Sequence, residues 1–500
     1  MTGRKFGLII ILVFLLIFSG TVFGAESSSP PKAKKAQSSS NGQAANAMVH
    51  AAMKNWTGDF NGMIKRRFIR VLVPYSKSFY FNDRGKQQGL TYETFRLFED
   101  NLNKKLKKKN IRTHVFFIPV SRDKLIPYLL EGKGDIAAGN LTVTTERLRK
   151  VDFSKPTYQN VSEIVITGPA SKPIAGKEDL SGQEVYVKKS SSFYESLQEL
   201  NAEFAKHKKA PVKIRLAPES LEVEDLLEMV NAGLVKATIA DSPIAEFWKQ
   251  IFAKIVLNYD ASIRINADIA WMIRKNSPQL KEALNKFLAL YPEGSKQRNV
   301  LLHKYLKNAK YAKEARSQSE MDKFEKVADF FKKYGDQYEM DYLLMLAQGY
   351  QESRLDHSAR SKAGAIGIMQ VMPATGKSMK VGDITKLEAN IHAGVKYIHF
   401  MVEQYYKDEP MDALNKGLFA FAAYNAGPNR IEQFRKLATK RGLNPNVWFN
   451  NVELIAAEKI GRETVTYVSN IFKYYLAYQL LVEEEKERRE AVEQMKKEAK

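Results

Sequence analysis

The stretch QGYQESRLDHSARSKAGAIGIMQ, residues 348–370, decides how the C-terminal part of the chain folds. An apolar run over residues 340–350 predicts a helix that carries one acid, Glu352, at its C-terminal end. Asp356 and the glycines that follow it predict a turn that stops this helix. The chain returns as Gly-Ile-Met-Gln, residues 367–370, which we expect to begin another helix.

Glu352 has the position of a general acid. The C-terminus of a helix is the negative end of its macrodipole, which favours the protonated form of a carboxyl group. Desolvation by apolar neighbours acts in the same direction. An acid that is still protonated near neutral pH is what glycosidic bond cleavage requires. The alternative is a surface carboxylate, since charged side chains are mostly exposed.

Four short motifs accompany this acid in a fixed order. They are Glu352-Ser353, residues 367–370 (GIMQ), residues 423–427 (AYNAG) and residues 463–468 (ETVTYV). Together they resemble the catalytic domain of the soluble-type lytic transglycosylases, which have a goose-lysozyme-like fold. The resemblance predicts an all-α lysozyme-like transglycosylase domain over residues 325–482.

The resemblance also implies a reaction. Such enzymes cleave the β-1,4 bond between MurNAc and GlcNAc of peptidoglycan glycan strands without water, leaving 1,6-anhydro-MurNAc ends. One carboxyl group, Glu352, would act first as acid and then as base, and an intramolecular nucleophile gains effective concentration. Hydrolases normally need two carboxyl groups, and Asp356, the nearest second one, is interpreted as a turn residue. A lysozyme-type muramidase and a non-catalytic peptidoglycan-binding sensor remain the alternatives.

Further site residues follow from the same resemblance. Ser361 would supply a hydroxyl near the acid, and Tyr467 would orient the acid. The residues expected to line the saccharide cleft are Met369, Gln370, Tyr424 and Asn425. Met369 and Tyr424 are equally compatible with plain core positions, because apolar residues at helical spacing are usually core. No cofactor and no metal ion are expected.

An α/β pattern precedes the helical region. Residues 68–74 and 113–119 have the texture of buried strands, and residues 134–138 form a third candidate strand. Residues 89–106 and 122–131 between them have helical spacing. Alternation of this kind predicts an α/β domain with a mainly parallel sheet.

The motifs of this region resemble the family 3 periplasmic solute-binding proteins. The resemblance implies a two-lobed domain over residues 67–292, with residues 269–274 as the closing strand of the second lobe. It rests on residues 132–139 (GKGDIAAG), 141–147 (LTVTTER) and 151–158 (VDFSKPTY) in the first lobe, and on residues 180–187 (LSGQEVYV) and 237–243 (ATIADSP) in the second.

Three ligand contacts follow from this second resemblance. Arg147 would clamp an α-carboxylate with its planar fork, Asp241 would take an α-ammonium group, and Thr142 would donate a hydroxyl. Arg147 at the start of a solvent-facing helix is the alternative. The loop at residues 188–192 (KKSSS) departs from the family's Gly-Ser/Thr pattern. The expected ligand is therefore an amino acid or a wall-derived muropeptide, which would make the cleft a sensor or guide for the enzyme domain.

The N-terminus predicts export. Residues 1–24 combine Arg4 and Lys5 with an apolar run and a small-residue end, which is typical of a signal peptide or, alternatively, an anchor. Residues 25–66 are expected to be a disordered tether, with a short helix over residues 44–60 as the alternative. The chain has no cysteine, which excludes disulfides and lipid attachment at cysteine. We therefore expect a periplasmic protein at the periphery of a membrane, the outer membrane in particular.

Charged segments complete the chain. Residues 293–324 are interpreted as a helical connector, and residues 483–500 as a solvated helical tail of alternating charge without an apolar stripe. The formal net charge is +22. An exported protein rarely meets nucleic acid, so anionic wall polymer or a membrane surface is the expected partner.

Overall fold

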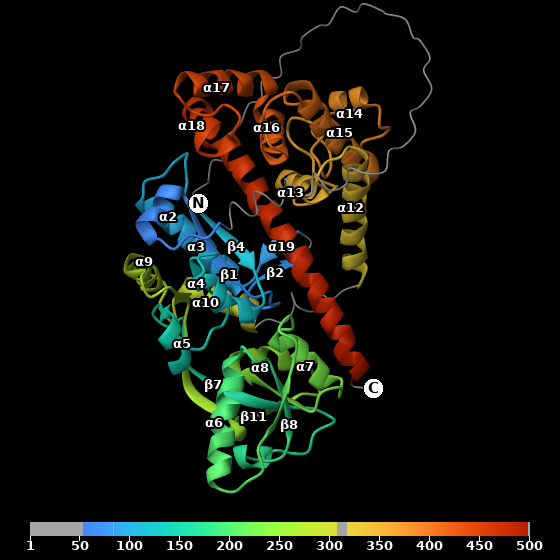
Figure 1. Cartoon of the computed structure of the whole chain (residues 1–500). Coiled ribbons are helices and arrows are strands. Elements are labelled where there is room, and N and C mark those ends of the chain that lie inside the picture. Colours follow the sequence, from blue (N-terminus) through green and yellow to red (C-terminus); the bar gives the residue numbers. More distant parts are fainter. Residues whose placement is uncertain (1–53, 84, 308–317, 499–500) are drawn as a thin grey trace, which may run out of the picture.

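The computed structural model describes residues 54–83, 85–307 and 318–498. Two α/β lobes and one helical domain are visible, and a long helix, α19, runs from the helical domain toward the second lobe (Figure 1). The predicted leader and most of the predicted tether lie outside the described residues. Within those residues no helix is both long and apolar enough to cross a bilayer.

The first lobe is built on a five-stranded sheet with strand order β4-β1-β5-β13-β6. Strands β4, β1 and β5 are parallel, and β13 is antiparallel to both of its neighbours. Aromatic side chains fill the space between the sheet and its helices, with the rings of Phe95 and Trp271 4.4 Å apart. The elements are β1 (Phe68–Val73), β2 (Phe81–Asp83), β3 (Lys86–Gln88), α3 (Leu90–Lys105), β4 (His114–Pro119), α4 (Leu125–Leu130), β5 (Ile136–Ala137), α5 (Thr145–Lys150), β6 (Asp152–Phe153), β13 (Met272–Ile273) and α9 (Pro278–Leu288).

The second lobe has a sheet of order β11-β7-β10-β8-β9, with β12 also paired to β7. Strand β10 runs parallel to β8 and antiparallel to β7. Helices α7 and α8 pack on a buried apolar cluster that includes Trp248. The elements are β7 (Tyr158–Thr167), β8 (Glu184–Val187), α6 (Ser192–Lys206), β9 (Lys213–Leu216), α7 (Val223–Asn231), β10 (Ala237–Asp241), α8 (Ser242–Lys249), β11 (Val256–Asn258) and β12 (Arg264–Ile269).

The chain crosses between the lobes twice, from β6 to β7 and from β12 to β13. Backbone bonds tie these crossings together, because the Thr157 amide donates to Ile269 O (2.7 Å) and the Val143 amide donates to Asp268 O (2.8 Å). The prediction that residues 269–274 close the second lobe is therefore wrong. Strand β13 joins the first-lobe sheet, and the segment before it is the return crossing.

Two segments that were predicted as tether and connector pack on the α/β domain. Helix α2 (Phe60–Arg66) begins at Asp59, whose carboxylate accepts from the Phe60 amide, and it buries Met63. The tether prediction is thus wrong for residues 54–66. The segments around them are polar, and the short amphipathic helix α2 was therefore not recognised from the sequence. In the connector, α10 (Lys296–Leu302) and the π-helical turn at His303–Lys307 follow, and Tyr305 is fully buried against the second lobe.

The C-terminal domain is all-helical, as its pattern predicts. Its helices enclose one large core around α13, which is buried at eight consecutive positions from Leu343 to Tyr350. Neither α18 nor the π-turn before it was predicted from the sequence. The elements are α12 (Gln318–Gln337), α13 (Tyr342–Ser353), α14 (Pro373–Met379), α15 (Leu387–Tyr405), α16 (Ala413–Ala426), α17 (Pro428–Lys440), the π-turn (Trp448–Val452), α18 (Glu453–Ile460) and α19 (Arg462–Glu498).

Helix α19 contradicts the prediction of a solvated tail. Its last turns lie on the second lobe, where Ala491 and Met495 are buried in the same apolar cluster as Trp248. Arg488 also forms an ion pair with the buried Asp225 at the start of α7. An apolar stripe is therefore present, although its members are few and lie four residues apart between charged neighbours.

The helical domain also contacts the first lobe directly. Arg67 makes a two-pronged ion pair with Glu453 of α18 at 2.8 Å, and the Lys473 ammonium of α19 lies 3.0 Å from the Glu99 carboxylate of α3. The hydroxyl of Tyr478 donates to Gly85 O (2.6 Å). These contacts seat the helical domain on the first lobe, and the end of α19 adds the contact with the second lobe.

Candidate active site

Helix α13 places Glu352. Its N-terminus is capped by Asp341, whose carboxylate accepts from the Leu343 amide (2.9 Å) and the Leu344 amide (3.3 Å). The helix ends at Arg354, which adopts the left-handed conformation with a φ of 62°. Glu352 is the penultimate residue and is half-buried, so its carboxyl group emerges where the helix leaves the core.

Glu352 meets Tyr467 of α19. The Tyr467 hydroxyl donates to Oε1 of Glu352, and the Gln348 amide donates to the same hydroxyl at 3.3 Å. Burial raises the pKa of Glu352 to about 7, and the Tyr467 hydrogen bond opposes that rise. A carboxyl group with this pKa is protonated in part of the molecules at neutral pH, as a general acid must be.

The Gly-Ile-Met-Gln segment is a tight turn, not the start of a helix as predicted. An antiparallel bridge between Ile366 and Val371 closes it, and Gln370 adopts a φ of 47°. Gly367 has a φ of 75°, and a Cβ there would lie 2.7 Å from the Asn390 amide group. Helix α14 begins later, at Pro373.

Three side chains fix this turn beside the acid. The Ser353 hydroxyl donates to Ile368 O (2.8 Å), so the end of α13 is joined to the turn. The Met369 amide donates to the buried Asn390 carboxamide (2.9 Å), and the Tyr424 hydroxyl donates to Met369 O (2.8 Å). Tyr424 therefore acts on the turn through the backbone.

The other predicted site residues differ in how they are buried and bonded. Met369 is fully buried, and its side chain fills the space over Gly394 and close to Gly349, so its prediction as a cleft residue is wrong and the core alternative holds. The Gln370 amide donates to Gly367 O (2.8 Å) within its own turn. The Ser361 hydroxyl accepts from the Ala365 amide (2.9 Å) and closes the loop after the acid.

Asn425 and Asp356 are both exposed. The Asn425 carboxamide oxygen accepts from the buried Thr464 hydroxyl (2.6 Å), which joins the third and fourth motifs. Asp356 accepts from the amide and the hydroxyl of Ser358 at 2.8 and 2.6 Å. These hydrogen bonds lower the pKa of Asp356, so it is an ionised turn residue beside the site.

Gln348 and Asn390 were missed. Gln348 is fully buried one helical turn before Glu352, and Asn390 is fully buried on α15. A polar residue inside an apolar helical run must find hydrogen-bond partners when it is buried. The position of Gln348 in such a run could therefore have marked it as a candidate site residue. Asn390 had none, because its partners lie in a turn that the sequence did not reveal.

The three predicted ligand residues of the α/β domain line one cavity between the lobes. Arg147 is buried, and its guanidinium donates to Thr142 O (2.9 Å) and Ser190 O (3.0 Å). It also lies 3.4 Å from the Glu195 carboxylate. The solvent-facing alternative for Arg147 is therefore wrong. The Thr142 hydroxyl accepts from Ser192 (3.0 Å), across the two lobes.

Asp241 is buried at the N-terminus of α8. The Asn140 amide of the first lobe donates to its Oδ2, while Oδ1 has no hydrogen-bond partner among the described residues. Burial, reinforced by the nearby Glu163 carboxylate, raises the pKa of Asp241 to about 7. This carboxyl group could accept a hydrogen bond from a ligand cation.

Three charged residues of the cleft were missed by sequence reasoning. Arg122 of the first lobe pairs with Glu222 of the second at 2.7 Å, and the buried Lys188 ammonium bonds the same carboxylate. Lys188 belongs to the loop whose sequence departs from the family pattern. The departure therefore places a lysine in the ligand cavity, paired with Glu222.

Comparison with known families agrees with this division of the chain. Residues 69–308 match the family described as bacterial extracellular solute-binding proteins, family 3, and residues 329–446 match the Transglycosylase SLT domain. The chain thus carries a family 3 solute-binding domain followed by an SLT transglycosylase domain.

Two relatives share most of their length with the chain. It is 29% identical to "Membrane-bound lytic murein transglycosylase F" of Pseudomonas fluorescens strain Pf-5 over 429 residues, 81% of this chain and 84% of the relative. The protein of the same name from Desulfosudis oleivorans is 25% identical over 433 residues, 81% and 89% of the two chains. An ancestral arginine-binding protein bound to arginine is 22% identical and covers 48% of this chain and 98% of its own, with a TM-score of 0.40.

Proposed function

We propose that the helical domain is a peptidoglycan lytic transglycosylase in which Glu352 is the acid and then the base. The observation that carries this proposal is the Glu352 carboxyl group, which has a pKa of about 7 and is held by Tyr467 at the end of a buried helix. Its nearest carboxylate in sequence, Asp356, is exposed and bonded within its own turn. One carboxyl group that can first donate and then accept a proton is enough when the nucleophile belongs to the substrate itself.

The proposed reaction begins with protonated Glu352. It gives its proton to the glycosidic oxygen between MurNAc and GlcNAc, and the bond from that oxygen to C1 breaks, which releases the GlcNAc 4-hydroxyl. The Glu352 carboxylate then removes the proton from the MurNAc 6-hydroxyl, whose oxygen bonds to C1. The ring closes without water, and Glu352 is protonated again. Holding the 6-hydroxyl beside C1 supplies the effective concentration that an external water lacks.

Tyr467 has a positioning role in this scheme. Its hydrogen bond stabilises the ionised form of Glu352, which is the form produced by the first step. The same contact fixes the direction of the carboxyl group, because Gln348 holds the hydroxyl from the other side. Tyr424, Ser353 and Asn390 hold the adjoining turn.

Digestion of purified sacculi tests the proposal. The Glu352→Gln variant should bind the glycan like the parent and release no soluble muropeptide, since Gln accepts the Tyr467 bond but has no proton to transfer. Asp356→Asn is the matched control and should digest like the parent. A lysozyme-type hydrolase would release reducing ends, and it would place Asp356 in the reaction. A Glu352→Gln variant as active as the parent would leave a glycan-binding sensor with catalysis elsewhere.

For the α/β domain we propose a ligand that carries both a carboxylate and an ammonium group, an amino acid or a muropeptide, and a sensing role toward the enzyme domain. Support comes from Arg147, Thr142 and Asp241, which line the same cavity. Calorimetry with amino acids and with muropeptides tests this, using Arg147→Gln to remove the carboxylate clamp and exposed Arg149→Gln as the control. Absence of saturable heat with both ligand classes would contradict the proposal.

We further propose that the protein is exported and works in the periplasm against the wall, at the periphery of the outer membrane. The leader-like residues 1–24 and the net charge of +22 support this. Cell fractionation with an antibody against the helical domain tests it. Recovery in the cytoplasm would contradict export.

A further inference from the structure

A second cavity lies on the first lobe, next to the ligand cleft and away from Glu352; Phe79 and Asn140 line both cavities. The second cavity has about 80 Å³ of room for the centres of water-sized molecules, and its mouth is open to solvent. Three kinds of element form its wall: helix α3, the end of α9 together with α10, and the two interlobe crossings. A molecule bound there would contact the first lobe, the two interlobe crossings and helix α10 of the connector at the same time.

The lining of this cavity is largely apolar. Trp271 and Phe287 are buried in its wall, and Leu97, Leu288 and Leu301 are half-buried. An open cavity with such a lining leaves apolar surface in contact with water, and covering that surface with a hydrocarbon chain is favourable. The walls therefore favour an aliphatic or aromatic body over a sugar or a peptide backbone.

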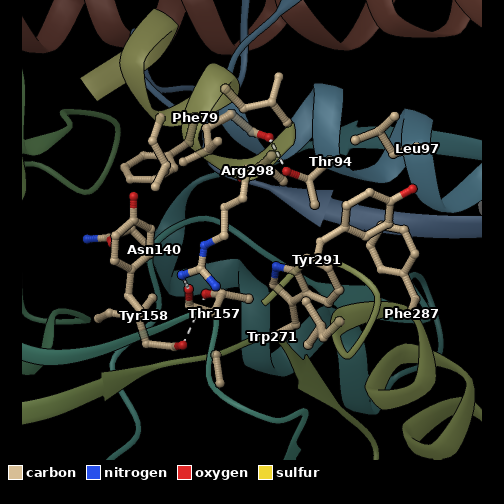
Figure 2. Close-up of a pocket in the computed structure, with 17 residues that line it drawn as sticks. Phe79, Thr94, Leu97, Asn140, Thr157, Tyr158, Trp271, Phe287, Tyr291 and Arg298 are labelled. Carbon is tan, nitrogen blue, oxygen red and sulfur yellow. Dashed lines mark hydrogen bonds between the residues drawn. The ribbon is translucent and has the colours of Figure 1, made fainter. Parts of the chain in front are cut away.

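One cation extends into the cavity. In Figure 2 the side chain of Arg298, from α10, reaches the centre of the space between Tyr158 and Trp271. Its guanidinium donates to Thr157 O and lies 5.1 Å from the centre of the Tyr158 ring. None of the described residues that line the cavity carries a carboxylate. Arg298 thus provides a positive charge inside an otherwise neutral and apolar site.

We propose that this cavity binds a single-chain amphiphile with a carboxylate head, a fatty acid. The carboxylate would accept hydrogen bonds from the Arg298 guanidinium, which matches it in planarity and charge. The chain would lie against Leu97, Leu288 and Leu301. The proposal does not depend on the glycan-cleaving activity, because the cavity shares no residue with the surroundings of Glu352.

Calorimetry with dodecanoate below its micellar concentration tests the proposal on the full chain. The parent should bind one dodecanoate saturably, and butanoate and dodecyltrimethylammonium should not bind there. Arg298→Gln should weaken dodecanoate binding about tenfold or more, since it removes the charge-assisted hydrogen bonds to the carboxylate. Lys296→Gln removes the same charge from an exposed position of the same helix and should bind like the parent.

A second variant keeps the test independent of Arg298 and its bond to Thr157. Leu97→Trp fills the cavity from α3 and should abolish binding while the circular dichroism spectrum stays that of the parent. Arg147→Gln should leave dodecanoate affinity unchanged, because Arg147 lines the other cavity. No saturable heat with the parent, equal binding of the cationic amphiphile, parental affinity in Arg298→Gln, or loss of binding in Arg147→Gln would each overturn the proposal.

Discussion

The Tyr467 hydroxyl donates a hydrogen bond to Oε1 of Glu352, although 115 residues separate the two in sequence. Tyr467 lies near the start of α19 and Glu352 near the end of α13, and these two helices pack against each other. The contact joins the acid of the first motif to the tyrosine of the fourth. Its geometry therefore depends on how α19 is held, and α19 reaches as far as the second lobe.

The pH dependence of activity should follow Glu352. Its pKa is about 7 because it is buried, and cleavage needs its protonated form. We expect the rate of sacculus digestion to be high below pH 7 and to fall about tenfold for each pH unit well above it. Initial rates between pH 5 and pH 9, at constant ionic strength, give this profile. A rate that rises through pH 7 would contradict the role of Glu352 as the acid.

Removing the hydroxyl of Tyr467 should change both the rate and the pH profile. The hydrogen bond lowers the pKa of Glu352, so Tyr467→Phe should move the alkaline limb to higher pH. The rate at pH 6 should fall about tenfold or more, as expected for a hydrogen bond to a charged group worth roughly 1.5–3 kcal/mol. Tyr474→Phe is the matched control, because Tyr474 lies on the same helix and bonds the exposed Arg354. An unchanged limb in Tyr467→Phe would show that the contact does not act on the acid.

The stability of Glu352→Gln should depend on pH in a defined direction. The folded pKa of Glu352 is raised above 4.5, its ordinary value, to about 7. Below pH 4.5 the acid is protonated in both states and costs nothing. Between pH 4.5 and 7 the unfolded chain ionises first, which destabilises the folded parent, and above pH 7 this cost is constant. The glutamine variant should therefore gain about 1–3 kcal/mol over the parent from pH 4.5 to pH 8.

Urea unfolding at pH 4.5 and pH 8 measures that gain. Asp356→Asn is the control of opposite sign, since hydrogen bonds lower the pKa of Asp356. Its carboxylate stabilises the folded state above its ordinary pKa, so this variant should lose stability relative to the parent as the pH rises. A constant difference between Glu352→Gln and the parent at both pH values would place Glu352 in solvent.

The C-terminal turns of α19 should detach when a charge enters their apolar contact. Met495 is buried against the second lobe, and Met495→Asp would bury a carboxylate without a partner. Hydrogen exchange of residues 486–498 should become at least about tenfold faster, which reflects local opening that costs roughly 1.4 kcal/mol less. Lys497→Asp places the same residue at an exposed position two residues away and should exchange like the parent. Equal exchange in both variants would mean that the tail is solvated after all.

Sequence reasoning located elements whose signal is local. Residues 340–350 form one apolar run, and Glu352 follows it directly, so both the helix and the position of its acid could be predicted. The strand before Pro74 and the helix from Leu90 were found for the same reason, since each has a hydrophobic period and a clear boundary.

The failures have a different origin. The turn at Gly367–Gln370 is set by the carboxamide of Asn390 and by the bridge between Ile366 and Val371. Asn390 is remote in sequence, and Ile366 and Val371 are not residue types that indicate a turn. Ala491 and Met495 are too few to give a period, and their partner surface lies in another domain. Features that depend on contacts between distant segments could not be predicted from local pattern.

The mass of the digestion products tests the central claim most directly. Purified protein incubated with sacculi in water enriched in ¹⁸O should release muropeptides with 1,6-anhydro ends, which carry no ¹⁸O and are one water lighter than reducing ends. The Glu352→Gln variant should release none of them. Products with reducing ends that contain ¹⁸O would show that water attacks the sugar, and would contradict a single carboxyl group acting on an internal nucleophile.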